Sequence, residues 1–271
     1  IAGISWIGCL EGREEEKIME AKAPSFSIII VTFNAEKVLE RTMESVFRQS
    51  YPNIEYIIID GASKDATVDN IKRYAGQLAY WVSEPDRGLY DAMNKGLRKA
   101  SGDYVLFLNA GDTLQRPDTI AGIAEIAQKN QLPDILYGET DLVDTEGRFI
   151  AHRRLKAPKQ LNWKSFRMGM LVCHQAFVVK RTLAPLYDLK YHYSSDFDWC
   201  IRCMKRTGNI QNTHLRLINY LNEGLTTSNQ KTSLKERYRI MAFYYGRIPV
   251  FFLHLWFAIR FYWAKWIKRI V

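Results

Sequence analysis

Two apolar stretches of the chain end in acidic or amide side chains that suit the binding of a divalent cation. The sequence FLNAGD ends one apolar run with Asn109 and Asp112, and a second run, 54–59, is followed directly by Asp60. Oxygen ligands of this kind suit Mg²⁺ or Mn²⁺, which bind through one or two carboxylates together with the phosphates of a substrate. A metal–nucleotide site is one interpretation, and a turn-capping role for Asp60 is an equally good one.

The elements that must position these side chains follow from the hydrophobic pattern of the first half of the chain. Unbroken apolar, β-branched runs predict buried strands, and apolar residues spaced i, i+4, i+8 predict amphipathic helices between them. This alternation indicates an α/β fold with a mostly parallel central sheet covered by helices on both faces. The predicted strands are 27–32, 54–59, 78–82 and 104–108, and the predicted helices are 35–49, 64–74 and 89–100.

The residues that follow the four predicted strands are mostly polar. Parallel α/β sheets bind ligands at the carboxyl ends of their strands, so these segments should gather at one edge and form a binding site. The chain has neither a GxGxxG after the first strand nor a GxxxxGK[ST], which argues against a dinucleotide-binding Rossmann site and against a P-loop. The four segments are Thr32–Asn34, Asp60–Ser63, Ser83–Gly88 and Asn109–Asp112.

The second half of the chain carries weaker signals. Cys200 and Cys203 form a single CxxC with no second pair at zinc-site spacing, which favours two small residues on one helix over a metal site. Short strands are predicted at 135–138, 148–151 and 176–179, a helix at 196–205, and an extended segment at 210–220.

The basic residues are concentrated at the C-terminus. The formal net charge is +9, and residues 231–271 hold nine Lys or Arg against one acid, Glu236, which accounts for +8 of it. A nucleic-acid-binding protein more often carries its charge on the folded body, so we expect no nucleic-acid partner. A basic, Trp-rich tail points instead to an anionic membrane surface. Residues 1–18 contain an acidic run, lack an initiating Met and precede Met19, and the segment 1–24 is interpreted as a poorly ordered leader or tag.

Residues 230–271 are predicted to form a basic, amphipathic helical tail that contacts a membrane surface through residues 248–271. The apolar run 248–259 is too short to cross a bilayer, whereas interfacial Trp with Lys and Arg suits a helix lying in the headgroup region. The alternative is a helix that packs on the body or on a second subunit. One predicted face has Phe252, Leu255, Trp256, Ile259, Trp263, Trp266, Ile267 and Ile270, and the other has His254, Lys265, Lys268 and Arg269.

Two segments of the first half resemble a known protein family. SIIIVTFNAEKVLERTMESVFRQSYPNIEYIIIDGASKDAT, which starts at Ser27, resembles the opening of the inverting family-2 glycosyltransferases with the GT-A nucleotide-sugar-binding fold. SEPDRGLYDAMNKGLRKASGDYVLFLNAGD, which starts at Ser83, is similar to the branch that builds bacterial polysaccharides of the colanic-acid and O-antigen type. The resemblance is strong over 25–115 and looser over 170–228. It implies one domain with a donor-binding half, 25–115, and an acceptor and catalytic-base half, 116–229.

The resemblance also implies roles for individual residues of the donor half. Asp112 stands at the position of the family's metal-binding DxD-type motif, although many members have Asp where this chain has Asn109 and Gly111. Asp112 is therefore the expected ligand of a divalent cation, Mn²⁺ or Mg²⁺. The residues expected to bind the nucleotide or the donor sugar are Thr32, Asn34, Asp60, Asp86, Arg87, Asp91 and Asn109.

The second half supplies the catalytic base in this resemblance. Ser194–Trp199 is similar to the family's ED-type motif with Ser in place of Glu, and Asp196 matches the base that takes a proton from the attacking hydroxyl. Asp198 is a competing candidate that we expect to pair or cap, and Asp196 has the alternative role of a helix N-cap. His174, in a Cys-His-Gln motif similar to one of this branch, is expected either to contact the diphosphate, metal or acceptor or to be a hydrogen-bonded structural residue.

The activity that the resemblance implies is inverting transfer of a single sugar from a nucleotide-diphosphate sugar, with UDP the expected nucleotide. No QxxRW, which marks processive synthases in the family, follows Asp196. The implied acceptor is a saccharide on a polyprenyl diphosphate lipid, and the implied location is cytoplasmic, peripheral on the inner face of the cell membrane. The alternative is a catalytically weak or inactive protein that binds nucleotide sugars or membranes on the same fold.

Overall fold

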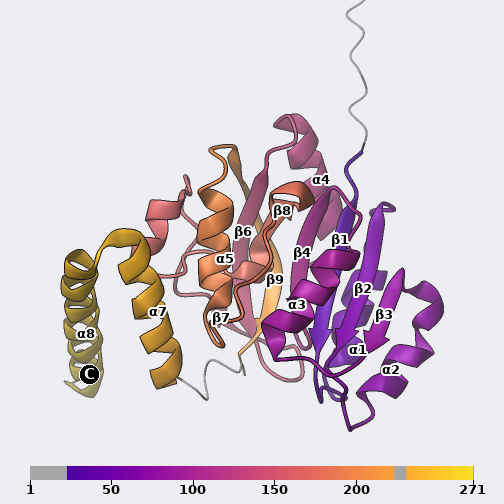
Figure 1. Ribbon diagram of the computed structural model, residues 1–271, viewed down its shortest axis with the longest axis horizontal. Coiled ribbons are helices and arrows are strands. Elements are labelled where there is room, and N and C mark those ends of the chain that lie inside the picture. The colour runs from indigo at the N-terminus through magenta and orange to yellow at the C-terminus, as the bar shows by residue number, and fades with distance from the viewer. Residues whose placement is uncertain (1–22, 223–229, 271) are drawn as a thin grey trace, which may run out of the picture.

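A computed structural model describes residues 23–222 and 230–270, so the predicted leader lies, up to residue 22, outside the described residues (Figure 1). Within these ranges the strands form one sheet in the order β3-β2-β1-β4-β8-β6-β9-β5, with β7 paired to β6. Helices cover both faces of this sheet, which confirms the predicted α/β fold. The strands are β1 (Phe26–Thr32), β2 (Ile54–Asp60), β3 (Tyr80–Ser83), β4 (Tyr104–Asn109), β5 (Thr113–Leu114), β6 (Ile135–Val143), β7 (Phe149–His152), β8 (Phe177–Lys180) and β9 (Ile210–Leu221).

The four N-terminal strands form the parallel half of the sheet around β1. Every residue of β1 is buried, and Ile29 is paired with Ile57 of β2 on one side and with Phe107 of β4 on the other. Because both faces of these strands are covered, their sequences are continuous apolar runs rather than alternating ones. The strand order turns back between β1 and β4, since β2 and β3 continue away on the other side of β1. A ligand site is expected at the carboxyl ends of the strands at such a point.

The helices differ in part from those that the hydrophobic pattern predicts. Helix α1 spans Leu39–Phe47 rather than 35–49, because the chain after Ala35 first makes a turn in which this residue's carbonyl accepts the amides of Val38 and Leu39. Helix α4 has no counterpart among the predicted elements. The remaining helices are α2 (Thr67–Arg73), α3 (Leu89–Lys99), α4 (Thr119–Lys129), α5 (Ser195–Met204), α7 (Gln230–Tyr245) and α8 (Arg247–Ile270), with 3₁₀ turns η1 (Ala75–Gln77), η2 (Trp163–Met168), η3 (His174–Ala176) and η4 (Arg181–Leu183).

Strand β8 joins the parallel half to the second half of the sheet. It runs antiparallel to β4 on one side and to β6 on the other, and β6 pairs in parallel with the long strand β9. The turn η3 leads directly into β8, so the Cys-His-Gln motif is held at the junction of the two halves. The carboxyl end of β9 in turn reaches the loop after β4, where Leu221 donates its amide to Asp112.

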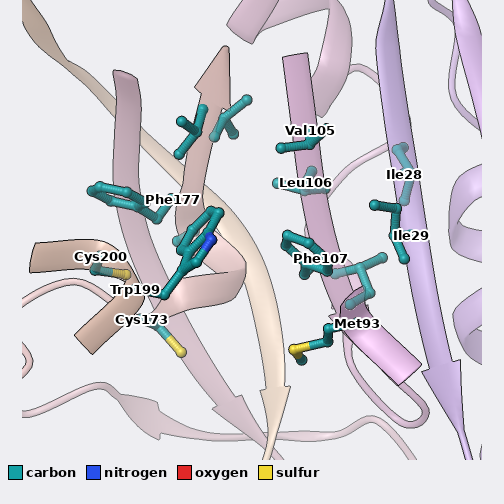
Figure 2. Packing of buried hydrophobic residues seen from close by; sticks show 14 of the residues in the cluster. Ile28, Ile29, Met93, Val105, Leu106, Phe107, Cys173, Phe177, Trp199 and Cys200 are labelled. Carbon is teal, nitrogen blue, oxygen red and sulfur yellow. The ribbon is translucent and has the colours of Figure 1, made fainter. Parts of the chain in front are cut away.

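A core of aromatic and aliphatic side chains fixes α5 against the sheet (Figure 2). The ring of Trp199 stacks on Tyr187 at 5.0 Å and meets the edge of Phe107 at 5.6 Å, and its indole nitrogen donates to the carbonyl of Pro185. Burying a large aromatic side chain contributes several kcal/mol, roughly 3–5 kcal/mol as judged by truncation to Ala. Because Trp199 lies one turn after Asp196 on the same helix, this packing also sets the position of that carboxylate.

The two C-terminal helices form a hairpin at one end of the molecule, with α8 outermost and α7 between it and the rest (Figure 1). The chain reverses at Gly246, whose φ of 89° suits glycine. The predicted apolar face of α8 is exposed at Phe252, Leu255, Trp256, Ile259 and Trp263. No helix within the described ranges is both long and apolar enough to cross a membrane. The side chains at Lys265, Trp266, Ile267, Lys268, Arg269 and Ile270 lie outside the described part of the structure.

The opposite face of α8 is partly covered by the rest of the protein. His254, predicted on this face, is half-buried, and its ring meets the edge of Tyr238 of α7 at 5.0 Å. Val250, on the same side, is 1% exposed. This face therefore packs on α7, because the packing buries apolar residues that lie between the predicted stripe positions.

Candidate functional site

A pocket of about 600 Å³ opens at the carboxyl ends of β1 and β4, where the strand order turns back. Parts of its wall come from the segments after β2 and β3, and Tyr220 and Leu221 of β9 close the far side. Four strand ends thus meet at one site, as the sequence predicts. The lining residues are Val31, Thr32, Phe33, Ala35, Gly61, Pro85, Asp86, Gly88, Leu89, Ala92, Asn109, Ala110, Asp112, Tyr220 and Leu221.

The rim of the pocket depends on two close contacts between loops. Asn34 has a φ of 48°, and its side-chain oxygen accepts the amide of Lys64, which ties the segment after β1 to the segment after β2. A Cβ on Gly61 would lie 2.6 Å from a carboxylate oxygen of Asp86, so a larger residue at this position would displace the Asp86 side chain. The contact brings Asp86 to the pocket wall, where it was predicted to act.

Two of the predicted donor-binding residues have buried polar atoms without a hydrogen-bond partner among the described residues. These atoms are the hydroxyl oxygen of Thr32 and the side-chain oxygen of Asn109, and both residues line the pocket. Leaving a buried polar atom unpaired costs about 1–3 kcal/mol. Such atoms in a native pocket call for an explanation, and a polar ligand that supplies the missing partner is a direct one.

Asp112 forms the floor of the pocket and is 2% exposed. One carboxylate oxygen accepts the amide of Leu221 at 3.0 Å, and the other accepts Nε2 of Gln175 at 2.8 Å and the amide of Asn109 at 3.3 Å. Burial raises the pKa of Asp112 to about 6, although these hydrogen bonds and the charge of His174 act in the opposite direction. Each carboxylate oxygen has two lone pairs, so the oxygen bonded only to Leu221 keeps one free.

The loop that carries Asp112 is held from α1. Arg41 donates one guanidinium nitrogen to the carbonyl of Gly111 at 2.9 Å and the other to the carbonyl of Thr145 at 2.8 Å. The hydroxyl of Thr42 accepts the amide of Gly111 at 2.8 Å. Gly111 has a φ of 100°, and a Cβ there would lie 2.5 Å from the side chain of Leu221. Glycine is therefore required at this position both by its backbone conformation and by the close approach of β9.

Asp196, the predicted base, lies at the start of α5 with its side chain 15% exposed. One carboxylate oxygen accepts the hydroxyl of Tyr90 at 3.0 Å and the amide of Phe197 at 2.9 Å, and the other lies 3.3 Å from Nδ1 of His174. Burial raises the pKa of Asp196, but His174, the charge of Arg237 and the Phe197 amide outweigh it, so the pKa lies below its ordinary value. The group is therefore ionised at neutral pH, as a proton acceptor must be.

The neighbours His174 and Gln175 link the two acids. His174 lies beside Asp196, and Gln175 is hydrogen-bonded to Asp112, so two adjacent residues of η3 contact both groups. The other ring nitrogen of His174, Nε2, is buried with no partner in the described ranges. His174 thus has a hydrogen-bonding role, as one of its two predicted alternatives states, and it also has a free nitrogen at the site.

Three other predicted site residues are occupied by contacts within the protein. Asp60 is fully buried at the end of β2, where it accepts hydrogen bonds from Ser63 and Ser83, and it does not line the pocket. Asp91 accepts the amide and the guanidinium of Arg87, whose side chain is 76% exposed. Asp60 therefore stabilises the rim, and Arg87 is the only member of this group with a largely exposed charged side chain.

Asp198, the competing candidate for the base, pairs with other residues as expected. Its carboxylate accepts Nε of Arg202 at 2.6 Å and the hydroxyl of Tyr244 at 2.8 Å. The side chain faces α7 instead of the predicted base position. The fold therefore gives the two acids of the motif different surroundings, and Asp196 alone lies next to His174.

Several residues that hold the site were not predicted from the sequence. Gln175 and Tyr90 contact the two key acids directly, Arg41 holds the metal-motif loop, and Glu236 accepts the backbone amides of residues 192–194 just before α5. Gln175 lies within the Cys-His-Gln motif, for which the resemblance implies a role only for its His. The other three are separated from their partners by 42 or more residues in sequence, so a linear pattern could not indicate them.

The residues at the pocket floor fit an oxygen-preferring divalent cation. Asp112 has one carboxylate lone pair free, and Asn109 has an unpartnered side-chain oxygen, both of which are hard ligands that suit Mg²⁺ or Mn²⁺. Within residues 23–222 and 230–270 there is no cluster of three or more His, Cys, Asp or Glu side chains arranged around a possible metal position.

The fold and the site define a class of protein: a mostly parallel α/β sheet with a pocket at its switch point and a separate buried carboxylate, Asp196, connected to the pocket through His174 and Gln175. The sequence model of a known family, described as glycosyl transferase family 2, matches residues 27–184 of the chain. This match covers more than half of the chain, and the chain belongs to glycosyl transferase family 2.

Curated relatives are similar over two thirds of the chain. It is 35% identical over 188 residues to the PGL/p-HBAD biosynthesis glycosyltransferase of Mycobacterium bovis (strain BCG / Pasteur 1173P2), which covers 67% of this chain and 70% of that protein. It is 29% identical over 196 residues to the amylovoran biosynthesis glycosyltransferase AmsB of Erwinia amylovora, with 67% of this chain and 64% of that protein covered.

Solved structures share the fold. The crystal structure of S. aureus TarS 1–349 in complex with UDP superposes with a TM-score of 0.64 at 18% identity, over 80% of this chain and 64% of that chain. The mannosyltransferase PcManGT from Pyrobaculum calidifontis in complex with GDP-Man and Mn²⁺ superposes with a TM-score of 0.58 at 17% identity, over 80% of this chain and 63% of that one. This chain therefore spans less than two thirds of either solved chain, and at these identities the likeness concerns the fold alone.

Proposed function

We propose that the protein is an inverting glycosyltransferase that moves a single sugar from a nucleoside-diphosphate sugar to a hydroxyl group of a saccharide acceptor. The observation that carries this proposal is the ionised carboxylate of Asp196 at the end of a series of contacts that begins at the pocket floor. Asp112 is bonded to Gln175, and the adjacent His174 lies beside Asp196. A base next to a phosphate-binding pocket is what transfer to a hydroxyl requires.

In the proposed reaction the donor lies in the pocket, with its nucleotide against β1 and its diphosphate near Asn109 and Asp112. The acceptor hydroxyl gives its proton to Asp196 while its oxygen forms a bond to the anomeric carbon. The bond from this carbon to the diphosphate oxygen breaks, and the nucleoside diphosphate leaves with the electron pair. Attack from the face opposite the leaving group inverts the anomeric centre, by the same stereochemical logic as in inverting hydrolysis.

A divalent cation is part of the proposal. Asp112 and Asn109 would hold it, with the diphosphate and water as further ligands. When bound, it would neutralise negative charge on the leaving diphosphate. Mn²⁺ is the first ion to test, because PcManGT was solved with Mn²⁺ and a guanosine diphosphate sugar. UDP is the first nucleotide to test, because TarS was solved with UDP and with UDP-GlcNAc.

The acceptor is proposed to be a saccharide on a polyprenyl diphosphate lipid, reached by a protein bound peripherally to the inner face of the membrane. The exposed apolar side chains of α8 support this, since a lipid-linked acceptor must be met at a bilayer surface. Residues 25–115 would bind the donor and residues 116–229 the acceptor. Glu236 of α7 would also support the acceptor half, because its carboxylate holds the chain just before α5.

The test of this function is Asp196→Asn with two readouts. Thermal stabilisation by UDP-sugars and Mn²⁺ should remain as in wild type, while transfer to a membrane lipid extract should fall by roughly 10²–10⁴-fold. The matched control is Asp198→Asn on the same helix. It should lower stability through the lost contacts with Arg202 and Tyr244, while the transfer rate of the folded protein should stay unchanged. If wild type binds nucleotide sugars but transfers none to any extract, the chain is instead a binding protein on this fold.

A further inference from the structure

The structure contains a second basic region that does not belong to the tail. Residues 147–187 hold nine Lys or Arg and no Asp or Glu. Acids elsewhere in the body cancel the charge of this region in the total, so the net charge of the chain does not reveal it. Five of its cations are exposed and have no acidic partner among the described side chains: Arg154, Lys156, Lys159, Lys164 and Arg167.

Part of this region lies directly against the C-terminal hairpin. Trp163 of η2 stacks on Tyr245, the last residue of α7, at 5.6 Å with the rings 8° from parallel, and the Tyr245 hydroxyl donates to the carbonyl of Trp163. Lys205, at the end of α5, lies over the rings of Trp163 and Tyr244 at 5.2 and 5.4 Å. The aromatic contacts therefore join η2, α5 and α7 at the corner where the chain turns into α8.

Four exposed cations surround this corner, and we call them the corner cluster. Lys164 lies 5.8 Å from the ring of Trp163. Burial raises the pKa of Tyr245, and the positive charge of the nearby Arg167 acts in the opposite direction. Lys205 lies over the rings of Trp163 and Tyr244, and Arg247 begins α8 two residues after the end of α7. None of the four forms an ion pair with a described acid. The members are Lys164, Arg167, Lys205 and Arg247, all exposed.

The outer face of α8 begins at this corner. Its large apolar side chains recur at helical spacing, and their exposed fractions run from 43% for Trp256 to 72% for Ile248. A contiguous set of this kind marks an interaction surface. We call it the apolar stripe, and its members are Ile248, Phe252, Leu255, Trp256, Ile259 and Trp263.

The distribution of charge decides which partner fits. Helix α8 contains five Lys or Arg and no acid, with Arg247 at its start and Lys265, Lys268 and Arg269 near its end. At about 1.5 Å per residue, its 24 residues span about 36 Å. Along the chain, cations therefore stand before and after the apolar stripe, and within it Arg260 lies 5.1 Å from the ring of Trp256. Because the helix has no acid, a second copy of the chain would bring like charges together, whereas a flat anionic surface would attract them.

We propose that the corner cluster and the apolar stripe form a single binding surface for a bilayer with anionic headgroups. Helix α8 lies in the plane of the membrane with the stripe in the headgroup region, and the corner cluster of the body contacts the same headgroups. This inference deepens the proposed membrane contact and rests on it. It adds that the folded body, and not the tail alone, reads the charge of the membrane.

The test is binding of the full chain to two kinds of vesicle. One is phosphatidylcholine alone, and the other is phosphatidylcholine with about 30% phosphatidylglycerol, which gives the surface a negative charge. Lys164→Glu/Arg167→Glu should weaken partition to the anionic vesicles by at least about tenfold, because each cation near such a surface contributes roughly fivefold. Partition to the neutral vesicles should stay unchanged. The matched control, Lys72→Glu/Arg98→Glu on α2 and α3, makes the same change of charge far from the hairpin.

A second variant separates insertion from charge. Leu255→Ser/Trp256→Ser, on exposed positions of α8, should weaken binding to both kinds of vesicle without unfolding the body. Stabilisation by UDP and Mn²⁺, measured on every variant, reports the donor site independently, so loss of donor binding would count against the proposed function and not against this surface. The inference is overturned if the Lys164/Arg167 variant binds anionic vesicles like wild type, or if it loses affinity for duplex RNA while vesicle binding is kept.

Discussion

Nδ1 of His174 lies 3.3 Å from the carboxylate of Asp196, and this pair is the point where the two halves of the site meet. His174 belongs to the turn before β8, and Asp196 begins α5. Because the contact favours the ionised carboxylate, it helps to keep the pKa of Asp196 below its ordinary value even though the group is largely buried. The relationship makes His174 a positioning residue for the proposed base.

His174→Ala should therefore change the pH dependence of transfer as well as its rate. Without the hydrogen bond, burial dominates and the pKa of Asp196 rises, so the acidic limb of the kcat/KM profile moves to higher pH. We expect kcat at neutral pH to fall roughly tenfold or more, but less than on removal of the base itself. His192→Ala, at an exposed ring near the same helix, is the control. An unchanged acidic limb in the His174 variant would show that this contact does not tune the base.

The same pair predicts a change in stability, with a defined sign. A carboxyl whose pKa is lowered on folding stabilises the folded chain above its unfolded pKa, and this contribution disappears as the pH falls through the lowered value. His174→Ala should thus reduce the free energy of unfolding at neutral pH and have little effect under acidic conditions where Asp196 is protonated. Urea denaturation at several pH values measures this difference.

Glu236 provides a separate means of positioning Asp196. Its carboxylate accepts the amides of His192, Tyr193 and Ser194 at 2.9, 2.8 and 3.1 Å, and it is 7% exposed. Glu236→Ala would leave three amides without this acceptor, so we expect a kcat loss of roughly tenfold or more and a stability loss of about 1–3 kcal/mol. Stabilisation by donor should persist, because the pocket lies elsewhere. Lys235→Ala, the exposed neighbour on α7, is the control, and equal kcat values for the two variants would refute the role.

The parts of the structure that the sequence predicts are those with a local signature. Unbroken apolar runs identify β1, β2 and β4, because both faces of these strands are buried, and the polar segments after them identify the pocket edge. The position of Asp112 on the pocket floor follows from the same pattern. By contrast, α4 was missed although Ile120, Ile123 and Ala127 are buried at helical spacing.

The parts that could not be predicted depend on contacts between distant segments. The sequence leaves Asp60 with two roles, and the fold agrees with the turn-capping one, since Asp60 accepts the amide of Ser63; its second partner, Ser83, has no local signature. Whether Ser83, 23 residues away, would reach it is decided by the pairing of β2 with β3 and not by local spacing. The basic region 147–187 can be read from the sequence, but its position against the C-terminal hairpin cannot, because this position depends on the contact between Trp163 and Tyr245.

Arg41 is expected to control the loop that carries Asp112. It links the carbonyls of Gly111 and Thr145, which belong to the loop after β4 and the loop after β6. Arg41→Ala should lower stability by about 1.5–3 kcal/mol, the range for hydrogen bonds of a charged donor, and should weaken donor-dependent stabilisation. Arg48→Ala, at the C-terminal end of the same helix, removes an exposed i,i+4 pair with Glu44 and should cost less than about 1 kcal/mol. If both variants lose donor binding equally, the effect comes from α1 as a whole and not from the two hydrogen bonds of Arg41.

Asp112 gives the clearest dependence of stability on pH in the absence of metal. Burial raises its pKa from 3.8 to about 6, so the folded chain holds this proton more tightly than the unfolded chain. A raised pKa contributes stability that is complete below the unfolded value and is lost as the pH rises through the folded value. From pH 4 to pH 7 the free energy of unfolding of wild type should therefore fall, relative to Asp112→Asn, by up to about 3 kcal/mol. Asp69→Asn, on the exposed face of α2, is the control, and parallel profiles for wild type and Asp112→Asn would show that the carboxyl is not buried as a charge.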